Sequence, residues 1–512
     1  MSGRKKRAAV NIAFGYAGQL VTAVMSFILR SVFILKLSET LLGVNAVYTN
    51  VLTLLSMAEL GIGTALGYSL YSPVAEKDTD TVKSYMLFYR RAYRYIALMV
   101  AVIGLVLIPF LPVICKNSVG LSRNELTLYY LIFLFNTVST YFVSYKYSLV
   151  NAEQRNYIQT NINTITKVIT VFFQILVLLF SSSFLMYLLT DAFVQLIQKI
   201  FVSRYLDRLY PYLKDRDILP LSQEKTREIW KKTRALVLHR VGDMLRLQTD
   251  TVIISSFLEV AVAGLVDNYI MVVGCVSNFV GIMFNSVISA FGNLIATEDR
   301  KKQYDLFLVY RFCAVWLYGF SATGFILLLT PLIYLWLGEH WILPASAVSL
   351  FLIDYYFKGE RIVLSNFKTA AGVFEQDKYL SMLQGIVNLI ISIVLVRKIG
   401  LTGIYVGTVV SGLIANITKP VIIYRVCFNK NALSYFADSV KYMLIPAVTS
   451  IICFLLKNRI MSVPTMSGFL IMALIITILF NTAFILAFHK SAPFRYLYGI
   501  AAGKLHRGTE RS

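Results

Sequence analysis

The chain has 512 residues, of which 57% are hydrophobic and only 15% charged, and its mean hydropathy is +0.67. A soluble protein of this length does not need so much apolar surface for its core, so the composition excludes a soluble fold and predicts an all-α membrane protein. The net charge of +22 would favour nucleic-acid binding in a soluble protein, but in a membrane protein the basic residues must first be sorted by loop.

Apolar runs long enough to cross a hydrocarbon core of about 30 Å as helices follow one another along the chain. In the first half they occupy 8–36, 42–70, 93–114, 126–149, 158–180 and 184–203. In the second half they occupy 237–258, 262–295, 309–336, 345–371, 379–396 and 402–424, and a terminal pair follows at 440–456 and 467–488. We therefore expect about 14 transmembrane helices.

Basic residues gather in alternate connecting segments, near 4–7, 90–91, 204–234, 300–302 and 490–511. The positive-inside rule predicts that these segments and both termini lie in the cytoplasm, which agrees with an even number of helices. The basic charge then reflects topology and contact with anionic lipids, and we expect no nucleic-acid partner. The first apolar stretch lacks a small-x-small cleavage site, so we expect it to be a retained helix.

The chain contains an internal repeat. A shift of 221 residues places Gly43 on Gly264, Tyr48 on Tyr269, Ala75 on Ala296 and Tyr89-Arg90 on Tyr310-Arg311, and a shift of 222 places Glu153-Gln154-x-x-Tyr157 on Glu375-Gln376-x-x-Tyr379. The repeat predicts two parallel, pseudo-symmetric six-helix lobes, 1–205 and 235–426. Between them, 206–234 reads as a basic cytoplasmic linker, and 427–512 adds two helices and a basic cytoplasmic tail.

Several segments together resemble a known family. They are Asn11 to Gln19, Leu42-Gly43-Val44-Asn45, Ala58-Glu59-Leu60-Gly61-Ile62-Gly63-Thr64-Ala65, Tyr71-Ser72-Pro73 and Phe88-Tyr89-Arg90. This pattern resembles the Wzx-type polysaccharide flippases of the multidrug/oligosaccharidyl-lipid/polysaccharide exporter (MATE-like) superfamily. The resemblance implies two lobes in a V around a cavity, a bacterial inner membrane location, and export of a polyprenyl-diphosphate-linked oligosaccharide by alternating access. It also implies possible partnership with a polysaccharide polymerase and glycosyltransferases.

The seventh expected helix carries a stripe of ionisable residues, which are costly at membrane depth and are functional candidates for that reason. His239, Asp243, Arg246 and Asp250 are spaced by four, three and four residues and share one helical face. This face either lines a cavity or forms an Asp–Arg–Asp ladder that only fixes helix packing.

The tenth expected helix repeats this design with Asp354, Lys358 and Arg361, and Ser365 and Lys368 continue the stripe. A diphosphate-linked sugar needs cationic ligands, and Arg suits bidentate phosphate contacts. Arg30, Arg246, Lys358 and Arg361 are therefore the predicted substrate ligands. Lys146 and Lys368 lie near the inner ends of their helices and could equally be interfacial anchors.

The first expected helix presents Gln19, Ser26 and Arg30 on one stripe, as a wet wall for sugar hydroxyls or as polar contacts between helices. The same two interpretations apply to four polar residues of the fifth helix, Asn161, Asn163, Lys167 and Gln174. Glu59 lies before the small-residue pair Gly63 and Gly67, and could pair with Arg30 or bind a coupling cation.

Enzyme chemistry finds little support in the sequence. There is no P-loop, H-E-x-x-H or G-x-S-x-G motif, and the four His and five Cys are scattered, so we expect no catalysis, no cofactor, no metal and no disulfide. The leading interpretation is the flippase. The alternatives are a cation-coupled small-molecule or multidrug exporter of the same fold and, less favoured, a membrane glycosyltransferase or polymerase.

Overall fold

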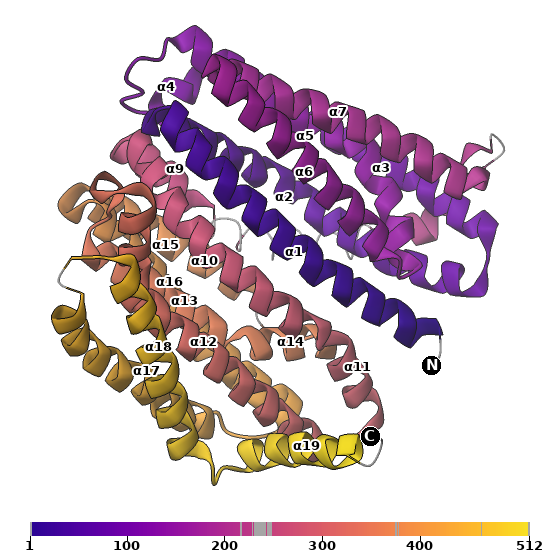
Figure 1. Ribbon diagram of the computed structural model, residues 1–512. Coiled ribbons are helices and arrows are strands. Elements are labelled where there is room, and N and C mark those ends of the chain that lie inside the picture. The colour runs from indigo at the N-terminus through magenta and orange to yellow at the C-terminus, as the bar shows by residue number, and fades with distance from the viewer. Residues whose placement is uncertain are drawn as a thin grey trace. The chain divides into compact units, whose positions relative to one another are not determined.

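The computed structural model describes residues 3–215, 218–227, 229, 242, 248–373, 376, 378–461 and 463–509, and in this part of the chain all regular structure is helical (Figure 1). The first half contains α1 (Gly3–Lys36), α2 (Glu39–Glu76), α3 (Thr79–Val106), η1 (Ile108–Phe110), α4 (Leu111–Ile114), α5 (Arg123–Ala152), α6 (Asn156–Ser181), α7 (Phe184–Leu209) and η2 (Pro211–Lys214). The second half contains α9 (Thr249–Phe257), α10 (Val260–Ser286), α11 (Ile288–Thr297), α12 (Arg300–Leu337), η3 (Glu339–Trp341), α13 (Ala345–Glu360), α14 (Ile362–Ala371), α15 (Lys378–Ile399) and α16 (Leu401–Ile423). The chain ends with the π-helical turn η5 (Tyr424–Phe428), α17 (Leu433–Ile460), α18 (Met466–Phe488) and α19 (Ala492–Thr509).

Within the described residues, 11 helices are long and apolar enough to cross a membrane, and the chain is a multi-pass membrane protein. The other three expected spans are not in this set. The run 42–70 lies within the long helix α2, residues 237–241 and 243–247 of the run 237–258 lie outside the described residues, and 345–371 is divided into α13 and α14. The all-α fold is confirmed, and the count of 14 stays a prediction.

The ends of the helices repeat with the sequence register. A shift of 221 places the bounds of α2, Glu39 and Glu76, on Val260 and Thr297, where α10 begins and α11 ends. The same shift places Asp78 on Asp299, and each of these side chains caps the following helix, α3 or α12, by accepting a backbone N–H bond. The repeat is therefore visible in where helices begin and end.

The helices form two compact units: Met1–Asp267 with Ser381–Arg397, and Asn268–Leu380 with Lys398–Ser512. We call them unit 1 and unit 2. Packing thus groups α9, the first residues of α10 and most of α15 with the first half of the chain. The sequence boundaries at 205, 234 and 426 were drawn from the repeat and not from packing, and they stay predictions.

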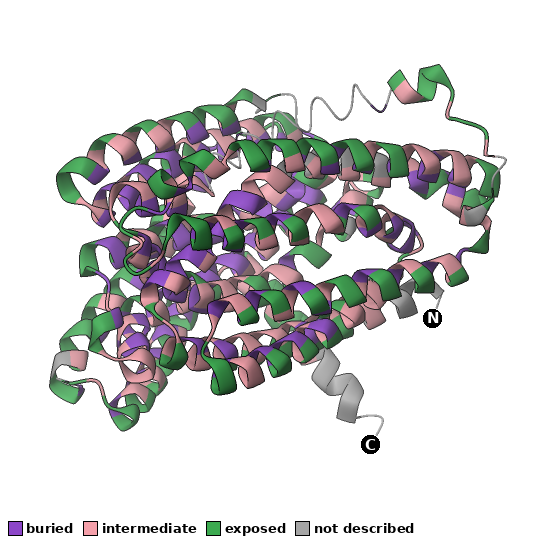
Figure 2. Ribbon diagram, turned by 90° about the horizontal axis from the view of Figure 1, so that it is seen from above, coloured by how far each residue is buried: buried purple, intermediate pink, exposed green. Residues whose placement is uncertain are grey.

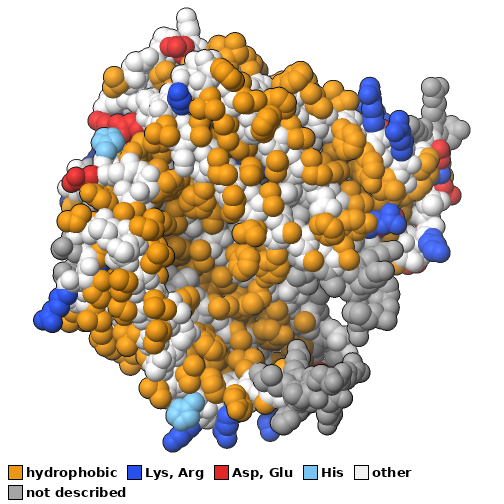
Figure 3. Space-filling model, viewed as in Figure 1, with side chains coloured by type: hydrophobic (Ala, Val, Ile, Leu, Met, Phe, Trp, Pro, Cys, Tyr) orange, Lys and Arg blue, Asp and Glu red, His pale blue; other side chains and the backbone are white. Residues whose placement is uncertain are grey.

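Apolar side chains form both the core and much of the surface. Figure 2 shows buried residues along the sides of helices that face neighbouring helices, and exposed residues along the outer sides. In Figure 3 hydrophobic side chains make up most of the visible face, and few charged ones interrupt it. On α6, for example, Ile165, Phe172 and Phe180 are exposed. Such a surface suits contact with lipid tails.

The two helices after the repeat pack against α12 in unit 2. Phe312, Phe480 and Phe484 are fully buried in a shared aromatic cluster, and the Trp316 indole Nε1 donates to Asn481 Oδ1 over 2.8 Å. A second anchor is Arg311, which is fully buried between Glu360 of α13 and Tyr435 of α17. The added helices are therefore an integral part of unit 2.

Candidate functional site

A polar stripe on α7 is the strongest candidate site of unit 1. Asp191, Gln195 and Lys199 are four residues apart and share one face of this helix, Phe184–Leu209. They line three adjoining cavities of about 220, 300 and 300 Å³ between α2, α5, α6 and α7. We call these three together the α7 polar cavity; Thr49, Asn136, Lys167 and Gln198 also line it.

Hydrogen bonds hold the charged groups of this cavity in place. Asn136 Nδ2 donates to Asp191 Oδ2 over 3.1 Å. Lys199 Nζ donates to the carbonyl oxygen of Asn136 over 2.8 Å and to Ser139 Oγ over 2.7 Å. Lys167 and Lys199 both interact electrostatically with Asp191, so one carboxylate faces two ammonium groups. The net charge of these three groups is positive, which favours an anionic ligand.

Arg30 lies near the same cavity and is mostly buried, with 13% of its side chain exposed. Its Nη2 donates to Asp267 Oδ2 over 2.6 Å. Arg30 also interacts electrostatically with Lys167. Glu59, the pairing partner considered from the sequence, hydrogen-bonds with Tyr93 instead. The salt-bridge partner, Asp267, was missed because it lies 237 residues away in the chain.

The other polar residues predicted on α1 are half-buried, and most of those predicted on α6 line the α7 polar cavity. Gln19 and Ser26 are half-buried on α1, the helix that packs along α6. On α6, Asn163 Oδ1 accepts from Gln198 Nε2 over 3.1 Å, and Gln174 Nε2 donates to the carbonyl oxygen of Tyr187 over 3.4 Å. Of the four polar residues on α6, Asn163, Lys167 and Gln174 line the α7 polar cavity.

Asp250 is the residue of the stripe expected on the seventh helix that the structure describes. His239, Asp243 and Arg246 lie outside the described residues. Asp250, at the start of α9, is described, and its Oδ1 accepts from Asn388 Nδ2 of α15 over 3.1 Å. Both residues belong to unit 1.

The tenth expected helix differs from its prediction because it is broken at Arg361. Lys358 Nζ forms an ion pair with Asp354 over 2.6 Å, with 41% of the lysine side chain and 4% of the aspartate exposed. Arg361 is buried, and its Nη1 donates to the carbonyl oxygen of Gly412 over 2.7 Å. Lys368 is buried on the shorter helix α14. Asp354 and Lys358 therefore lie on α13, and Lys368 lies on α14.

Sequence reasoning missed the stripe on α7, although the signal was present. Asp191 and Lys199 lie inside the apolar run 184–203, and ionisable residues at that depth are candidates by the same rule that selected Arg30.

Among the residues that the structure describes, no group of three or more His, Cys, Asp or Glu side chains could hold a metal ion.

The fold of the chain is similar to that of several solved membrane proteins. No protein-family profile matches the chain, and no curated protein does. Among solved structures, the lipid II flippase MurJ in an inward closed conformation has a TM-score of 0.63 at 12% identity, covering 91% of this chain and 98% of its own. An inward-facing multidrug resistance MATE transporter of the MOP superfamily has 0.61 at 13%, covering 80% and 96%. A point mutant of the MATE transporter VcmN of Vibrio cholerae has 0.59 at 15%, covering 84% and 99%. This chain therefore has the fold shared by MATE transporters and the flippase MurJ.

Proposed function

We propose that this chain is a flippase that moves a polyprenyl-diphosphate-linked oligosaccharide from the cytoplasmic to the outer leaflet by alternating access. The observation that carries the proposal is a cationic polar cavity that adjoins an apolar groove. Such a pair suits a ligand with an anionic head and a long hydrocarbon tail. In this proposal the protein lies in a bacterial inner membrane with both termini in the cytoplasm, as its basic segments predict.

The head of the substrate would bind among the cations of unit 1. Arg30, Lys167 and Lys199 face two carboxylates, Asp191 and Asp267, so the local balance is positive. Burying a diphosphate without cations would cost several kcal/mol or more, whereas each charge-assisted hydrogen bond contributes about 1.5–3 kcal/mol. Half-buried Gln19 and Ser26 of α1 would offer hydrogen bonds to sugar hydroxyls.

The tail would lie in the groove between α6 and α7, which has a volume of about 920 Å³. Its walls are apolar, with Ile165 and Phe173 on α6 and Phe193 and Ile197 on α7. Gln198 lines both this groove and the α7 polar cavity. A polyprenyl chain in the groove would therefore leave its headgroup at the polar end, while the rest of the chain stays in lipid.

The second half of the chain carries its own proposed ligands. Lys358 and Arg361, with Arg246, remain the proposed ligands from the second half of the chain. Glu59, Asp243, Asp250 and Asp354 are the proposed candidates for ion coupling or for structural ion pairs. Since the sequence has no P-loop, the energy would come from an ion gradient, the membrane potential or the substrate gradient; one charge moved across 100 mV is worth about 2.3 kcal/mol.

A cation-coupled exporter of small molecules is the second candidate. The observation in its favour is that Asp191 and Asp267 are both placed in the polar part of unit 1, where they could attract a proton, a metal cation or a cationic drug. Two of the similar structures are MATE transporters, one of them described as a multidrug resistance transporter. The excess of cations over carboxylates in the same region argues for the anionic substrate.

The test measures flipping of a polyprenyl-diphosphate-linked oligosaccharide in proteoliposomes, by its exposure to an added glycosidase, beside efflux of a cationic dye. We expect K199A and R30A to slow flipping at least about tenfold, since each removes one charge-assisted contact. R30K should also slow it because the bidentate fork is lost. K36A is the matched control, because Lys36 is an exposed cation at the end of the same helix as Arg30. Normal flipping by K199A and R30A at equal abundance, or dye efflux without flipping, would reject the proposal.

A further inference from the structure

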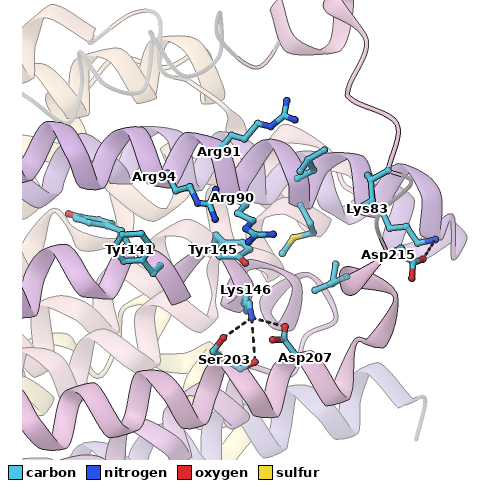
Figure 4. A pocket seen from close by; sticks show the side chains of 15 residues that line it. Lys83, Arg90, Arg91, Arg94, Tyr141, Tyr145, Lys146, Ser203, Asp207 and Asp215 are labelled. Carbon is cyan, nitrogen blue, oxygen red and sulfur yellow. Dashed lines mark hydrogen bonds and ion pairs between the residues drawn. The ribbon is translucent and has the colours of Figure 1, made fainter.

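Unit 1 contains a second, basic cavity that shares no residue with the α7 polar cavity (Figure 4). It has a volume of about 750 Å³, within the usual range of ligand sites. It lies between α3, the ends of α5 and α7, and the segment that follows η2. We call it the α3 basic pocket; its charged lining residues are Lys83, Arg90, Arg91, Arg94, Lys146, Asp207 and Asp215.

The two carboxylates of the α3 basic pocket are each matched by a lysine. Lys146 Nζ contacts Asp207 Oδ1 over 2.6 Å and also donates to Ser203 Oγ, and Lys83 Nζ contacts Asp215 Oδ2 over 2.7 Å. Throughout the described chain, no carboxylate forms an ion pair with any of the three arginines, which leaves a net charge of +3.

The arginines are placed by the spacing of α3. Arg90 and Arg94 are four residues apart, share one face of the helix, and extend toward Tyr145 and Lys146 in Figure 4. Arg91 is one residue further round and points away from them. All three are exposed. Two guanidinium groups on one face can bind a phosphate group by paired hydrogen bonds.

The internal repeat shows what is unusual about this pocket. The counterpart of Arg90 is Arg311, and Arg311 is fully neutralised in unit 2. Its Nη2 donates to Glu360 Oε1 over 3.0 Å, to the carbonyl oxygen of Tyr435 over 2.9 Å and to Ser439 Oγ over 2.7 Å. Tyr435 and Ser439 belong to α17, which lies outside the repeat.

Among the described residues of unit 1, Arg90 has no ion-pair partner that matches Glu360 and no helix that matches α17. The positions that correspond to Glu360 are Val138 and Ser139, which carry no charge, and the first half of the sequence has no counterpart of α17. The same repeated arginine is thus a buried structural anchor in unit 2 and an exposed lining residue of a cavity in unit 1. An anion bound in the cavity would supply the charge that Glu360 supplies to Arg311.

We propose that the α3 basic pocket binds a phosphate-bearing anion through Arg90 and Arg94. By the distribution of basic segments, this end of α3 lies at the cytoplasmic side of the membrane, where anionic phospholipid headgroups and soluble phosphates both occur. The site is separate from the proposed transport path and does not depend on what the chain transports.

The test titrates the full-length protein in neutral detergent with phosphatidylglycerol in one arm and inorganic pyrophosphate in the other, with native mass spectrometry as the readout. We expect R90Q/R94Q to weaken binding about 30-fold, the effect of losing two interfacial cations. R90K/R94K should lie between, because it keeps the charge but loses the guanidinium fork. The matched control is R425Q/R495Q, which removes two exposed arginines from unit 2 and should leave binding unchanged.

Each result decides the proposal. If only phosphatidylglycerol binds, and binding depends on Arg90 and Arg94, the proposal is supported and the site is assigned to a lipid headgroup. If only pyrophosphate binds with the same dependence, the site is assigned to a soluble phosphate. Binding of neither probe by the unchanged protein overturns it. Equal weakening by R90Q/R94Q and R425Q/R495Q also overturns it, because the attraction would then be general. All four substituted side chains are exposed, and circular dichroism checks that the helices are retained.

Discussion

The contact between Gly43 and the start of α10 offers a sharp test of the helix arrangement in unit 1. A Cβ atom added to Gly43 would lie 1.8 Å from the carbonyl oxygen of Val260, and one added to Gly264 would lie 2.8 Å from the carbonyl oxygen of Glu39. Gly43 and Gly264 are counterparts in the repeat, so the close approach of α2 and α10 involves the same repeated position from both sides.

The structure allows the cost of Gly43→Ala to be estimated. Cβ atoms essentially never approach other heavy atoms within 3.0 Å, so the helices must separate by about 1.2 Å, and the obstacle is backbone that cannot rotate away. Overpacking of this kind costs about 1–3 kcal/mol, and we expect the upper part of that range. Replacing a helical glycine by alanine returns about 1 kcal/mol. The expected net loss is about 2 kcal/mol of unfolding free energy.

Gly67→Ala is the matched control, because Gly67 lies on the same helix and an added Cβ there meets nothing within 4 Å. The assay is reversible denaturation in detergent micelles, with the reactivity of the buried thiols of Cys115 and Cys453 as a second signal. We expect G43A to be the least stable, G264A next, and G67A as stable as the unchanged protein or more so. If G43A is as stable as G67A, α2 and α10 do not approach in this way.

Three further predictions concern single contacts. Glu360→Gln should destabilise the protein by about 3–5 kcal/mol, because it leaves the buried charge of Arg311 unpaired, whereas R311M/E360L should be close to neutral; denaturation of the three proteins checks this. Asn11→Ala should lower the unfolding free energy by about 1–2 kcal/mol, since Asn11 donates to the carbonyl oxygen of Gln154 and accepts from the backbone N–H of Tyr157. N11D keeps only the acceptor, so its stability in the same assay should lie between those of N11A and the unchanged protein. Trp316→Phe should loosen α18 by the loss of one hydrogen bond, about 1 kcal/mol, which faster proteolysis near Asn481 would report.

Much of the fold could be predicted from the sequence because its signals are local. Apolar runs predicted the helices, and the register of the repeat agrees with the observed helix starts, including those capped by Asp78 and Asp299. The start of α3 was predicted too late, at 93 instead of Thr79, because Lys83, Arg90 and Arg91 lie in the part of the helix that precedes its apolar run. Hydropathy finds the part of a helix that suits lipid and not the whole helix.

The candidate site was harder to predict because it depends on contacts between distant segments. Periodicity placed Arg30 on a polar face but could not select Asp267 as its partner. The break at Arg361 also lacks a local signal as strong as proline. Gly359, two residues earlier, permits a close contact with α12, where an added Cβ would lie 2.0 Å from the ring of Tyr318. Such a contact is a property of packing between helices and not of either sequence segment alone.

Pairing, and not the number of charges, decides which cation in unit 1 is best suited to an anionic ligand. Arg30 is held by a carboxylate at 2.6 Å, so a diphosphate that binds Arg30 must compete with Asp267 for the guanidinium group. The hydrogen bonds of Lys199 go to two neutral oxygens, which are weaker competitors for an ammonium group than a phosphate is. Substitution of Lys199 should therefore reduce substrate affinity more than substitution of Arg30, while loss of Arg30 also leaves Asp267 without its salt-bridge partner.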